Sequence, residues 1–553
     1  MLRDILRAAG ERRVALAGAA AVAALLAAGG AVLGPRSALA QPPAAAAPPA
    51  LVVLLVVDQL RPDYLTRWAP QLTGGLGRLA RTGTFFPRAQ QDHAITQTAP
   101  GHSTTLSGRF PAHTGIITNA RGVPDPLAPI IGAPDAEPAS PRRFQGTTLY
   151  DWMLAADPGT RVLSASRKDR GAILPVGRAR GDVYWYGVNG EFTTSRYYRD
   201  TLPGWVQAWN ARRGVARLAG TTWQPLLAAD AYAEPDSQRW ENYGRDFVFP
   251  HRLPTALDSL VQRIRYVPWM DSLTLDLALE GVRQTGLGHR ARPDLLVVSL
   301  STVDAVGHDF GPDSRELHDQ VLRTDHWLDW FLDSLATLVP RERTLFALTA
   351  DHGVQSIPAF VREVRRRPSQ PLWLASLARE LRTAFAARFH SDAGFAFEYG
   401  LLLADTSELR ARALDVDSLS EALAARVRTL PGIAHVYTPR TLRAAPASDT
   451  LARRWRHSIP PEYGWLFAAT PLPDYPWEPQ EEGNHGTPNA ADVGVPIIFA
   501  GPGIPARRDE RVVRTVDIAP TLAAILGVRP TQPLDGRPIP GLAPPRATDG
   551  GRR

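Results

Sequence analysis

Cysteine is absent from all 553 residues of the chain. Without thiols, the protein cannot contain a disulfide framework, cysteine-bound zinc, a cysteine-bound cluster or a thiol nucleophile. Lysine is almost absent as well, because Lys168 is the single lysine among 62 basic residues and the other 61 are arginine. The remaining composition, with 44% hydrophobic and 21% charged residues, is that of an ordinary globular protein and excludes a disordered or fibrous one.

The charge of the chain does not point to a nucleic-acid partner. The 62 basic residues against 55 acidic ones give a net charge of +7, and the basic residues are scattered. Nucleic-acid binding requires basic residues gathered in a patch or stripe, so we expect none here. We interpret the run Arg362–Arg367 as a solvated face. The sequence contains no internal repeat and no feature that specifies an oligomeric state.

The N-terminus has the pattern of a secretory signal peptide. An apolar run at residues 14–33 is followed by Ser37-Ala38-Leu39-Ala40, which resembles an A-x-A cleavage site. The positive segment before the run contains Arg3, Arg7, Arg12 and Arg13. We expect cleavage after Ala40, a periplasmic or secreted protein without a membrane span, and a Pro/Ala linker at 41–50. The alternative is an uncleaved anchor, because the run approaches the roughly 20 residues that cross a bilayer.

Four continuous apolar runs predict strands that are buried on both faces of a parallel sheet. They are Leu51–Val57, Leu295–Leu300, Thr344–Ala350 and Val495–Ala500. Helical patterns lie between them, as in residues 317–335 after Gly311-Pro312-Asp313. This alternation predicts an α/β/α sandwich with a mostly parallel central sheet.

Three segments interrupt the alternation, near residues 125–165, 185–285 and 355–480. They are rich in proline, arginine and aromatic residues. We therefore predict one catalytic domain over residues 51–540, in which these insertions form a lid or a substrate wall, and a flexible tail at 541–553.

Aspartates follow three of the four predicted strands, namely Asp58, Asp304 and Asp351. One such aspartate could merely cap a turn, but ligands bind at the carboxyl edge of sheets of this kind, and three aspartates there favour a site. Histidines accompany them in the patterns Asp304-x-x-x-His308 and Asp351-His352, and a further histidine lies in Asn484-His485-Gly486. Carboxylates with imidazoles are a ligand set that suits zinc.

A candidate nucleophile precedes a predicted helix in the segment TQTAPGH at residues 96–102. One reading is structural, because threonine is a good helix cap and proline is favoured in a first turn. The other is functional, because a helix N-terminus attracts anions and a threonine oxygen bound to zinc would become an alkoxide nucleophile. We assign His102 and His113 to structural roles.

Together these residues resemble the alkaline phosphatase superfamily, and more narrowly its secreted, phosphate-irrepressible branch, which is close to the nucleotide pyrophosphatase/phosphodiesterases. The matching segments occur in the family's order over about 430 residues. They are VVDQLRPDYL (56–65), TQTAPGHSTTLSGRFPAHTGIITN (96–119), SRKDRGAILPVG (166–177), STVDAVGHDFGPDSRELHDQVLRTD (301–325), TADHG (349–353) and NHGT (484–487).

The resemblance implies an alkaline-phosphatase-like fold and a site with two zinc ions. One zinc would be held by Asp58, Thr98, Asp351 and His352. The other would be held by Asp304, His308 and His485. Asn119 would contact a phosphate oxygen, and Lys168 and Arg170 would supply the cationic pair of the monoesterase branch. Ala120-Arg121 departs from the acidic-aromatic continuation that the family pattern leads us to expect after the asparagine.

The predicted function is hydrolysis of small-molecule phosphate monoesters through a phosphothreonine at Thr98. A first alternative is a phosphodiesterase or nucleotide pyrophosphatase, for which Trp185, Tyr186, Phe192, Tyr197 and Tyr198 could line a groove. A sulfatase is disfavoured, because threonine replaces the Cys or Ser that such enzymes oxidise. An inactive, metal-stabilised binding protein is a distant alternative, since the ligand and nucleophile positions are intact.

Overall fold

A computed structural model describes residues 48–478 and 480–542 of the chain. The predicted signal peptide at 1–40, most of the predicted linker and the tail from 543 onward lie outside these residues. Ala50, which we placed at the end of the linker, is already buried, and its amide donates to the carbonyl of Arg343. Over the described ranges, no helix combines the length and the apolar character needed to cross a membrane.

A nine-stranded sheet forms the centre of the described chain. In order across the sheet, its strands are β15 (Arg507–Arg508), β2 (Thr84–Phe86), β14 (Ile497–Ala500), β9 (Thr344–Thr349), β1 (Leu51–Val57), β8 (Asp294–Leu300), β3 (Val162–Ser166), β4 (Asp182–Tyr186) and β5 (Phe192–Thr193). The five strands from β9 to β4 are mutually parallel. Every residue of β1 is buried, as its unbroken apolar run predicts. The predicted α/β fold with a mostly parallel sheet is confirmed.

The fourth predicted parallel strand runs the other way. Residues 497–500 form β14, which is antiparallel to both β9 and β2. The run is unbroken because all four of its residues are buried, and burial on both faces does not depend on strand direction. The carboxyl ends of β1, β8 and β9 therefore share one edge of the sheet, and β14 ends at the opposite edge.

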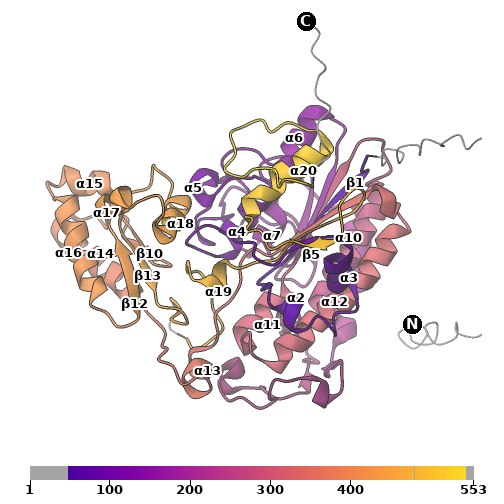
Figure 1. Ribbon diagram of the computed structural model, residues 1–553, viewed down its shortest axis with the longest axis horizontal. Coiled ribbons are helices and arrows are strands. Elements are labelled where there is room, and N and C mark those ends of the chain that lie inside the picture. The colour runs from indigo at the N-terminus through magenta and orange to yellow at the C-terminus, as the bar shows by residue number, and fades with distance from the viewer. Residues whose placement is uncertain (1–47, 479, 543–553) are drawn as a thin grey trace, which may run out of the picture. The chain divides into compact units, whose positions relative to one another are not determined.

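Helices cover both faces of this sheet (Figure 1). The helices α3 (Gly75–Thr82), α10 (Trp269–Thr285) and α12 (Arg315–Ala336) pack together on one face, and α6 (Leu149–Ala156) and α20 (Ile518–Leu526) pack together on the other. The helix predicted after Gly311-Pro312-Asp313 is α12. It begins at a cap in which the Ser314 hydroxyl accepts a hydrogen bond from the amide of Leu317 at 3.1 Å.

The segments that interrupt the sequence pattern contain parts of the main layers. The helix α6 and most of β3 fall inside 125–165, and β5 and α10 fall inside 185–285. The sequence VLSAS of β3 mixes small polar with apolar residues, so its burial leaves no apolar run to recognise. The remainder of these two segments consists of short helices, turns and the two-stranded pair β6 (Thr222–Trp223) and β7 (His251–Arg252).

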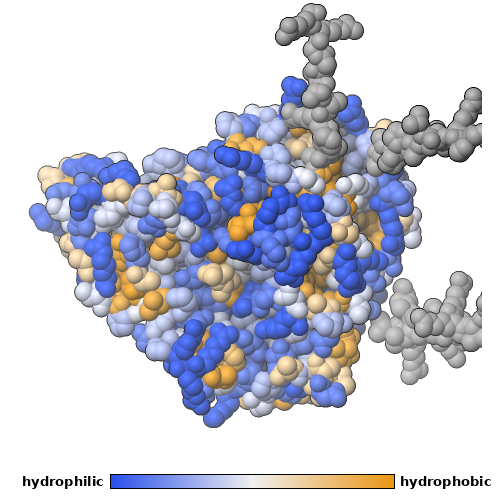
Figure 2. All heavy atoms as spheres, in the orientation of Figure 1, coloured by the Kyte–Doolittle hydropathy of each residue, from blue (hydrophilic) through white to orange (hydrophobic). Residues whose placement is uncertain are grey.

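The segment near 355–480 forms a second, antiparallel sheet. Its strands, in order, are β10 (Ala396–Glu398), β11 (Leu401–Leu403), β13 (Trp465–Pro471) and β12 (Ile433–Tyr437). The helices α14 (Ala375–Phe389) and α16 (Val416–Arg428) pack against it around a separate hydrophobic core, which is seen in orange in Figure 1. The surface over α13 (Pro358–Glu363) is mainly hydrophilic in Figure 2, and Arg362–Arg367 are exposed as predicted.

Candidate active site

Three buried aspartates meet at the shared carboxyl edge of the parallel strands. Asp58 directly follows β1, Asp351 follows β9, and Asp304 lies in the first turn of α11 (Thr302–Phe310), just after β8. Their exposure is 0%, 0% and 3%, respectively. Parallel neighbours in register end together, and this places three carboxylates from distant parts of the chain in one pocket.

Thr98 reaches this edge at the start of α4 (Thr98–Thr105). The structural reading, in which a threonine caps this helix, is wrong: Gln97 is the capping residue, and its side chain makes no capping hydrogen bond. Gly101 allows the first turn of α4 to approach the sheet edge, because a Cβ at this position would lie 2.1 Å from the carbonyl oxygen of Asp351. The close approach positions the Thr98 hydroxyl beside the aspartates.

The first group of potential metal ligands is Asp58, Asp351 and His352, whose ligand atoms lie within 4.8 Å of one another. The Nε2 atom of His352 is 3.5 Å from Asp58 Oδ1, from Asp351 Oδ2 and from Thr98 Oγ1. Its Nδ1 lies 3.0 Å from the carbonyl oxygen of Gly353. Nδ1 can only donate to a carbonyl, so Nε2 keeps its lone pair for a metal.

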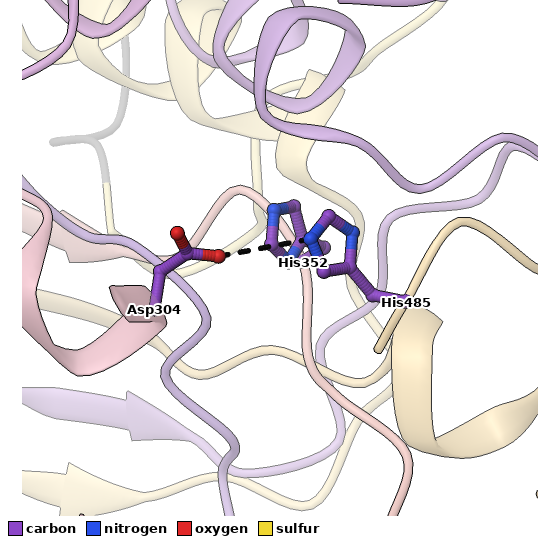
Figure 3. Close-up of side chains that lie close together, drawn as sticks. All are labelled: Asp304, His352 and His485. Carbon is purple, nitrogen blue, oxygen red and sulfur yellow. Dashed lines mark ion pairs between the residues drawn. The ribbon is translucent and has the colours of Figure 1, made fainter. Parts of the chain in front are cut away.

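The second group is formed by Asp304, His308 and His485. Asp304 Oδ1 is 3.3 Å from His308 Nε2 and 3.6 Å from His485 Nε2. Figure 3 shows the Asp304 carboxylate directed at the stacked rings of His352 and His485. His485 Nδ1 lies 2.7 Å from the carbonyl oxygen of Thr96, which again leaves Nε2 as the free lone pair. His352 also comes within 4.8 Å of Asp304 and His485 and therefore adjoins both groups.

The electrostatics of the protein atoms alone are unbalanced. Burial, followed by Asp304 and Asp351, raises the pKa of Asp58 well above its usual range. Burial also opposes ionisation of Asp304, but Lys168, His308 and His485 outweigh it and hold the pKa of Asp304 well below its usual range.

Several ligand atoms also lack partners. Asp58 Oδ1 and Asp351 Oδ2 are buried without a hydrogen bond, and the Nε2 atoms of His308 and His485 face each other at 3.2 Å. Cations between these atoms would satisfy all of them, so the residues present fit metal ions.

The predicted cations and the asparagine also reach this pocket. Lys168 lies between β3 and α7 (Asp169–Ile173), and its Nζ is 2.6 Å from Asp58 Oδ2, 2.6 Å from Asp304 Oδ2 and 3.2 Å from Thr98 Oγ1. Arg170 lines the same cavity. The Oδ1 of Asn119 accepts a hydrogen bond from the Ala99 amide at 2.9 Å, so its amide nitrogen is the group that can donate to a ligand.

Two residues of the site were missed by the sequence analysis. Gln59 has a left-handed backbone with a φ of 67°. Its backbone N–H donates to Asp351 Oδ1 and its side-chain Nε2 donates to Asp304 Oδ1, both at 3.1 Å, so it contacts two predicted metal ligands. Arg167 is buried, with its guanidinium 3.9 Å from Asp304. The sequence could have indicated both, because Gln59 directly follows Asp58 and Arg167 directly precedes Lys168.

The two histidines assigned to structure do not face the cavity. His102 Nδ1 lies 2.9 Å from the carbonyl oxygen of Thr98 and 3.2 Å from Asp351 Oδ2, and its Nε2 lies 2.8 Å from Ser299 Oγ, so it ties the first turn of α4 to β8. His113 pairs with Asp535 at 2.8 Å on the surface.

Arg121, which departs from the family pattern after Asn119, contacts a residue of the second sheet. Arg121 Nε is 2.8 Å from Glu398 Oε1, and the Thr118 hydroxyl donates to Glu398 Oε2 at 2.5 Å. Glu398 is the last residue of β10. The residues on both sides of Asn119 are thus fastened to one carboxylate, which keeps the asparagine loop at the cavity.

The cavity over these residues has a volume of about 1240 Å³. Its floor contains Thr98, Asp304, His308 and His485. Its walls include the aromatic residues Trp185, Tyr186, Tyr243, Tyr266 and Tyr399, together with several arginines and glutamates. The space is large enough for an organic phosphate ester, with a charged floor and a mixed wall.

Several known proteins are similar to this chain over most of its length. Alkaline phosphatase PhoV of Synechococcus elongatus is 29% identical over 512 residues, which cover 88% of this chain and 92% of that protein. Alkaline phosphatase PafA of Elizabethkingia meningoseptica is 28% identical over 517 residues, which cover 88% and 92%. The crystal structure of wild-type alkaline phosphatase PafA matches with a TM-score of 0.81 at 27% identity and covers 90% of this chain and 99% of that one.

A variant of the same enzyme has also been solved, with replacements at one threonine, one asparagine, one lysine and one arginine, and it matches with a TM-score of 0.82 at 26% identity. The predicted resemblance to the alkaline phosphatase superfamily is confirmed by these relatives. Residues 52–487 match the family of type I phosphodiesterases and nucleotide pyrophosphatases. The chain belongs to this family.

Proposed function

We propose that this protein is an alkaline phosphatase that hydrolyses phosphate monoesters. The observation that carries the proposal is the place of Lys168, whose ammonium lies 3.2 Å from the Thr98 hydroxyl. A monoester brings two negative charges to the nucleophile, and a diester brings one. A cation fixed beside Thr98 therefore stabilises the monoester reaction more strongly.

The two ligand groups are proposed to hold two zinc ions. Imidazole nitrogens and carboxylate oxygens suit zinc, and the described cluster offers both. We assign Asp58, Thr98, Asp351 and His352 to one ion, and Asp304, His308 and His485 to the other. Bound zinc would supply Lewis-acid charge that lowers the pKa of the nucleophile and offsets charge on the leaving oxygen.

The residues of the chain then have distinct tasks. Thr98 Oγ1 attacks phosphorus, the bond from phosphorus to the alcohol oxygen breaks, and the alcohol leaves with a proton. Water next attacks the phosphorus of phosphothreonine, which releases inorganic phosphate and restores Thr98. Asn119 donates to a nonbridging oxygen, while Lys168 and Arg170 neutralise the transferred group, so catalysis rests on positioning and charge.

The relatives support this assignment in two ways. Those compared above are named alkaline phosphatases, and they cover most of this chain. In the solved variant, the replaced threonine and asparagine are 21 residues apart, which is also the spacing of Thr98 and Asn119 in this chain. The replaced lysine and arginine are two residues apart, as are Lys168 and Arg170.

The test is a comparison of kcat/KM for 4-nitrophenyl phosphate and methyl 4-nitrophenyl phosphate, which share a leaving group. We expect the monoester to be strongly preferred. Preference for the diester would overturn the proposal. Absence of turnover of both by zinc-loaded protein would favour a binding function instead.

A phosphodiesterase is the second candidate function. The name of the matched family and one wall of the cavity favour it, because Val188, Tyr243 and Tyr266 are exposed hydrophobic residues that line this space. Such residues could hold the second ester group of a diester. The same pair of substrates decides between the two functions.

We also propose that the protein is exported, with cleavage after Ala40. The motivation is the basic and then apolar pattern of residues 3–40. N-terminal sequencing of protein secreted from the native host tests it, and a mature chain that still begins at Met1 would contradict cleavage.

A further inference from the structure

Four arginines line the cavity, and three of them, Arg167, Arg170 and Arg265, have in common an Nε that no described residue satisfies; of these three, only Arg170 has a part in the reaction described above. The others are Arg167, which precedes Lys168, and Arg265, which lies in the short helix η4 (Ile264–Tyr266). In each of the three, Nε is buried and makes no hydrogen bond within the described residues. The protein therefore satisfies these three guanidiniums only in part.

Arg265 is the least compensated of these cations. Over residues 48–478 and 480–542, no carboxylate comes within ion-pair distance of it, whereas Arg170 is 3.4 Å from Asp169 and Arg167 is 3.9 Å from Asp304. Arg263, two residues earlier, is paired with Asp309 at 3.7 Å and with Asp246 at 3.9 Å. Two neighbouring arginines of the same cavity thus differ in one respect, the presence of a counter-charge.

The three guanidiniums act on one another. Arg265 and Arg170 both lie close enough to Arg167 for their charges to act on it. Like charges gathered in a partly dry cavity repel, and an anion between them removes this repulsion.

Acidic residues also line the cavity. Glu478 and Glu482 lie near His308, and Asp309 is paired with Arg263. An anionic substituent on the alcohol part of a substrate would be repelled by Glu478 and Glu482 and attracted to Arg265, which has no such pairing among the described residues.

We propose that Arg265, assisted by Arg167, binds a second anionic group on the alcohol part of the substrate. The preferred substrates are then phosphate monoesters whose alcohol carries another phosphate or a carboxylate. The inference rests on the proposed phosphatase function and adds a substrate class to it. Lys168 and Arg170 serve the transferred phosphate, and Arg265 serves the group that leaves.

The experiment compares bisphosphates with matched monophosphates. The probes are propane-1,3-diyl and hexane-1,6-diyl bisphosphate, the corresponding hydroxyalkyl monophosphates, and 3-(phosphonooxy)propanoate as the carboxylate arm. We expect the zinc-loaded enzyme to favour at least one bisphosphate over its monophosphate. Arg265→Gln should reduce this kcat/KM ratio by about tenfold, while turnover of the hydroxyalkyl phosphates stays near that of the wild type.

Arg263→Gln is the charge-matched control, since it removes the same unit charge from the same cavity. It should leave the ratio nearly unchanged because its guanidinium is already neutralised. Arg265→Lys should restore part of the preference. Equal effects of the two glutamine variants would show that only the total charge matters and would overturn the subsite.

A binding measurement separates this inference from the proposed function. Calorimetry of the zinc-loaded Thr98→Ala protein with the bisphosphates should show tighter binding than with the monophosphates, and Arg265→Gln should abolish the difference. If simple monoesters are hydrolysed but the bisphosphates gain nothing in rate or affinity, the subsite is wrong and the phosphatase stands. If no monoester is hydrolysed, the phosphatase proposal fails and calorimetry alone decides the subsite.

Discussion

The imidazole rings of His352 and His485 stack with their centroids 3.5 Å apart and their planes 15° apart. Each ring has Nδ1 beside a backbone carbonyl, of Gly353 and of Thr96, respectively, and each presents Nε2 to a carboxylate. The stack joins the two ligand groups into one unit, because His352 adjoins both. Damage to one ring is therefore expected to be felt at both groups.

The first prediction concerns this shared histidine. His352→Ala should lower the zinc content of the purified protein by more than one ion per chain, whereas His485→Ala should mainly empty the group at Asp304 and leave the other partly filled. Elemental analysis of the two variants provides the measurement. His457→Asn, at a histidine that stacks on Phe110, is the control and should keep the wild-type content. Equal loss in all three variants would contradict the assignment of ligands.

Removal of metal should stop turnover. We expect a chelator to inactivate the enzyme and added zinc to restore it, with about two zinc ions per chain in the active protein. The physical reason is that three buried carboxylates and three imidazoles converge on one pocket, where Asp58 Oδ1 and Asp351 Oδ2 have no hydrogen bond among the described residues. An active preparation that contains no metal would overturn this part of the mechanism.

Thr98→Ala should abolish turnover and leave the fold intact. The side chain begins α4 and faces the ligand groups, so its loss removes the nucleophile but little packing. Thr98→Ser should keep measurable activity, because the chemistry needs only the hydroxyl. Trapping of labelled phosphate on the protein, followed by identification of the modified residue, checks the covalent step. Label found on another residue would contradict it.

Lys168→Ala should lower kcat/KM for monoesters by at least about tenfold, the effect of losing one charge-assisted contact. The kcat/KM for diesters should change much less, so the preference of the enzyme for monoesters over diesters should decrease. Arg170→Ala should act in the same direction, and the two losses should not add if both cations hold one oxygen. Equal effects on both substrates would make the lysine a structural support, given its contacts with Asp58 and Asp304.

Arg121→Ala should weaken activity without removing any group from the cavity. The arginine shares Glu398 with Thr118, and the pair fixes the loop that carries Asn119. We expect a several-fold loss in kcat with a smaller change in KM, because the asparagine contact matters most in the transition state. Arg121→Lys should recover part of the loss. If Arg121→Ala behaves as the wild type, the asparagine loop is held by other contacts.

The stability of the folded protein should depend on pH through Asp492. This buried carboxyl accepts hydrogen bonds from Thr487 and Gln355, yet burial raises its pKa to about 7. Between its ordinary value and pH 7, the folded state binds a proton that the unfolded state releases. The free energy of unfolding should therefore fall as pH rises, by up to about 1.4 kcal/mol per pH unit in that window.

Urea unfolding of the wild type and of Asp492→Asn from pH 4 to pH 8 measures this dependence. The difference between the two proteins should shrink as pH rises. Asp415→Asn, at an exposed helix cap where hydrogen bonds lower the pKa of the carboxyl, should not reproduce the effect. Parallel pH curves for the wild type and Asp492→Asn would rule out Asp492 as the cause.

The sequence by itself determined three of the parallel strands and the family, and it predicted the ligand residues. Unbroken apolar runs mark β1, β8 and β9 because strands buried on both faces exclude polar residues, and the motifs keep their order over most of the chain. It could not determine the direction of β14 or find β3, since burial leaves the same apolar signal in either direction and small polar residues hide a strand.

Only the tertiary structure decided which side chains meet. It paired Arg121 with Glu398, 277 residues later in the chain. It also brought Gln59, through a left-handed backbone, into hydrogen bonds with the predicted ligands Asp304 and Asp351. It likewise gave Arg263 two carboxylate partners and gave its neighbour Arg265 none among the described residues. Such pairings depend on contacts between segments far apart in the chain, and local sequence patterns carry no record of those distances.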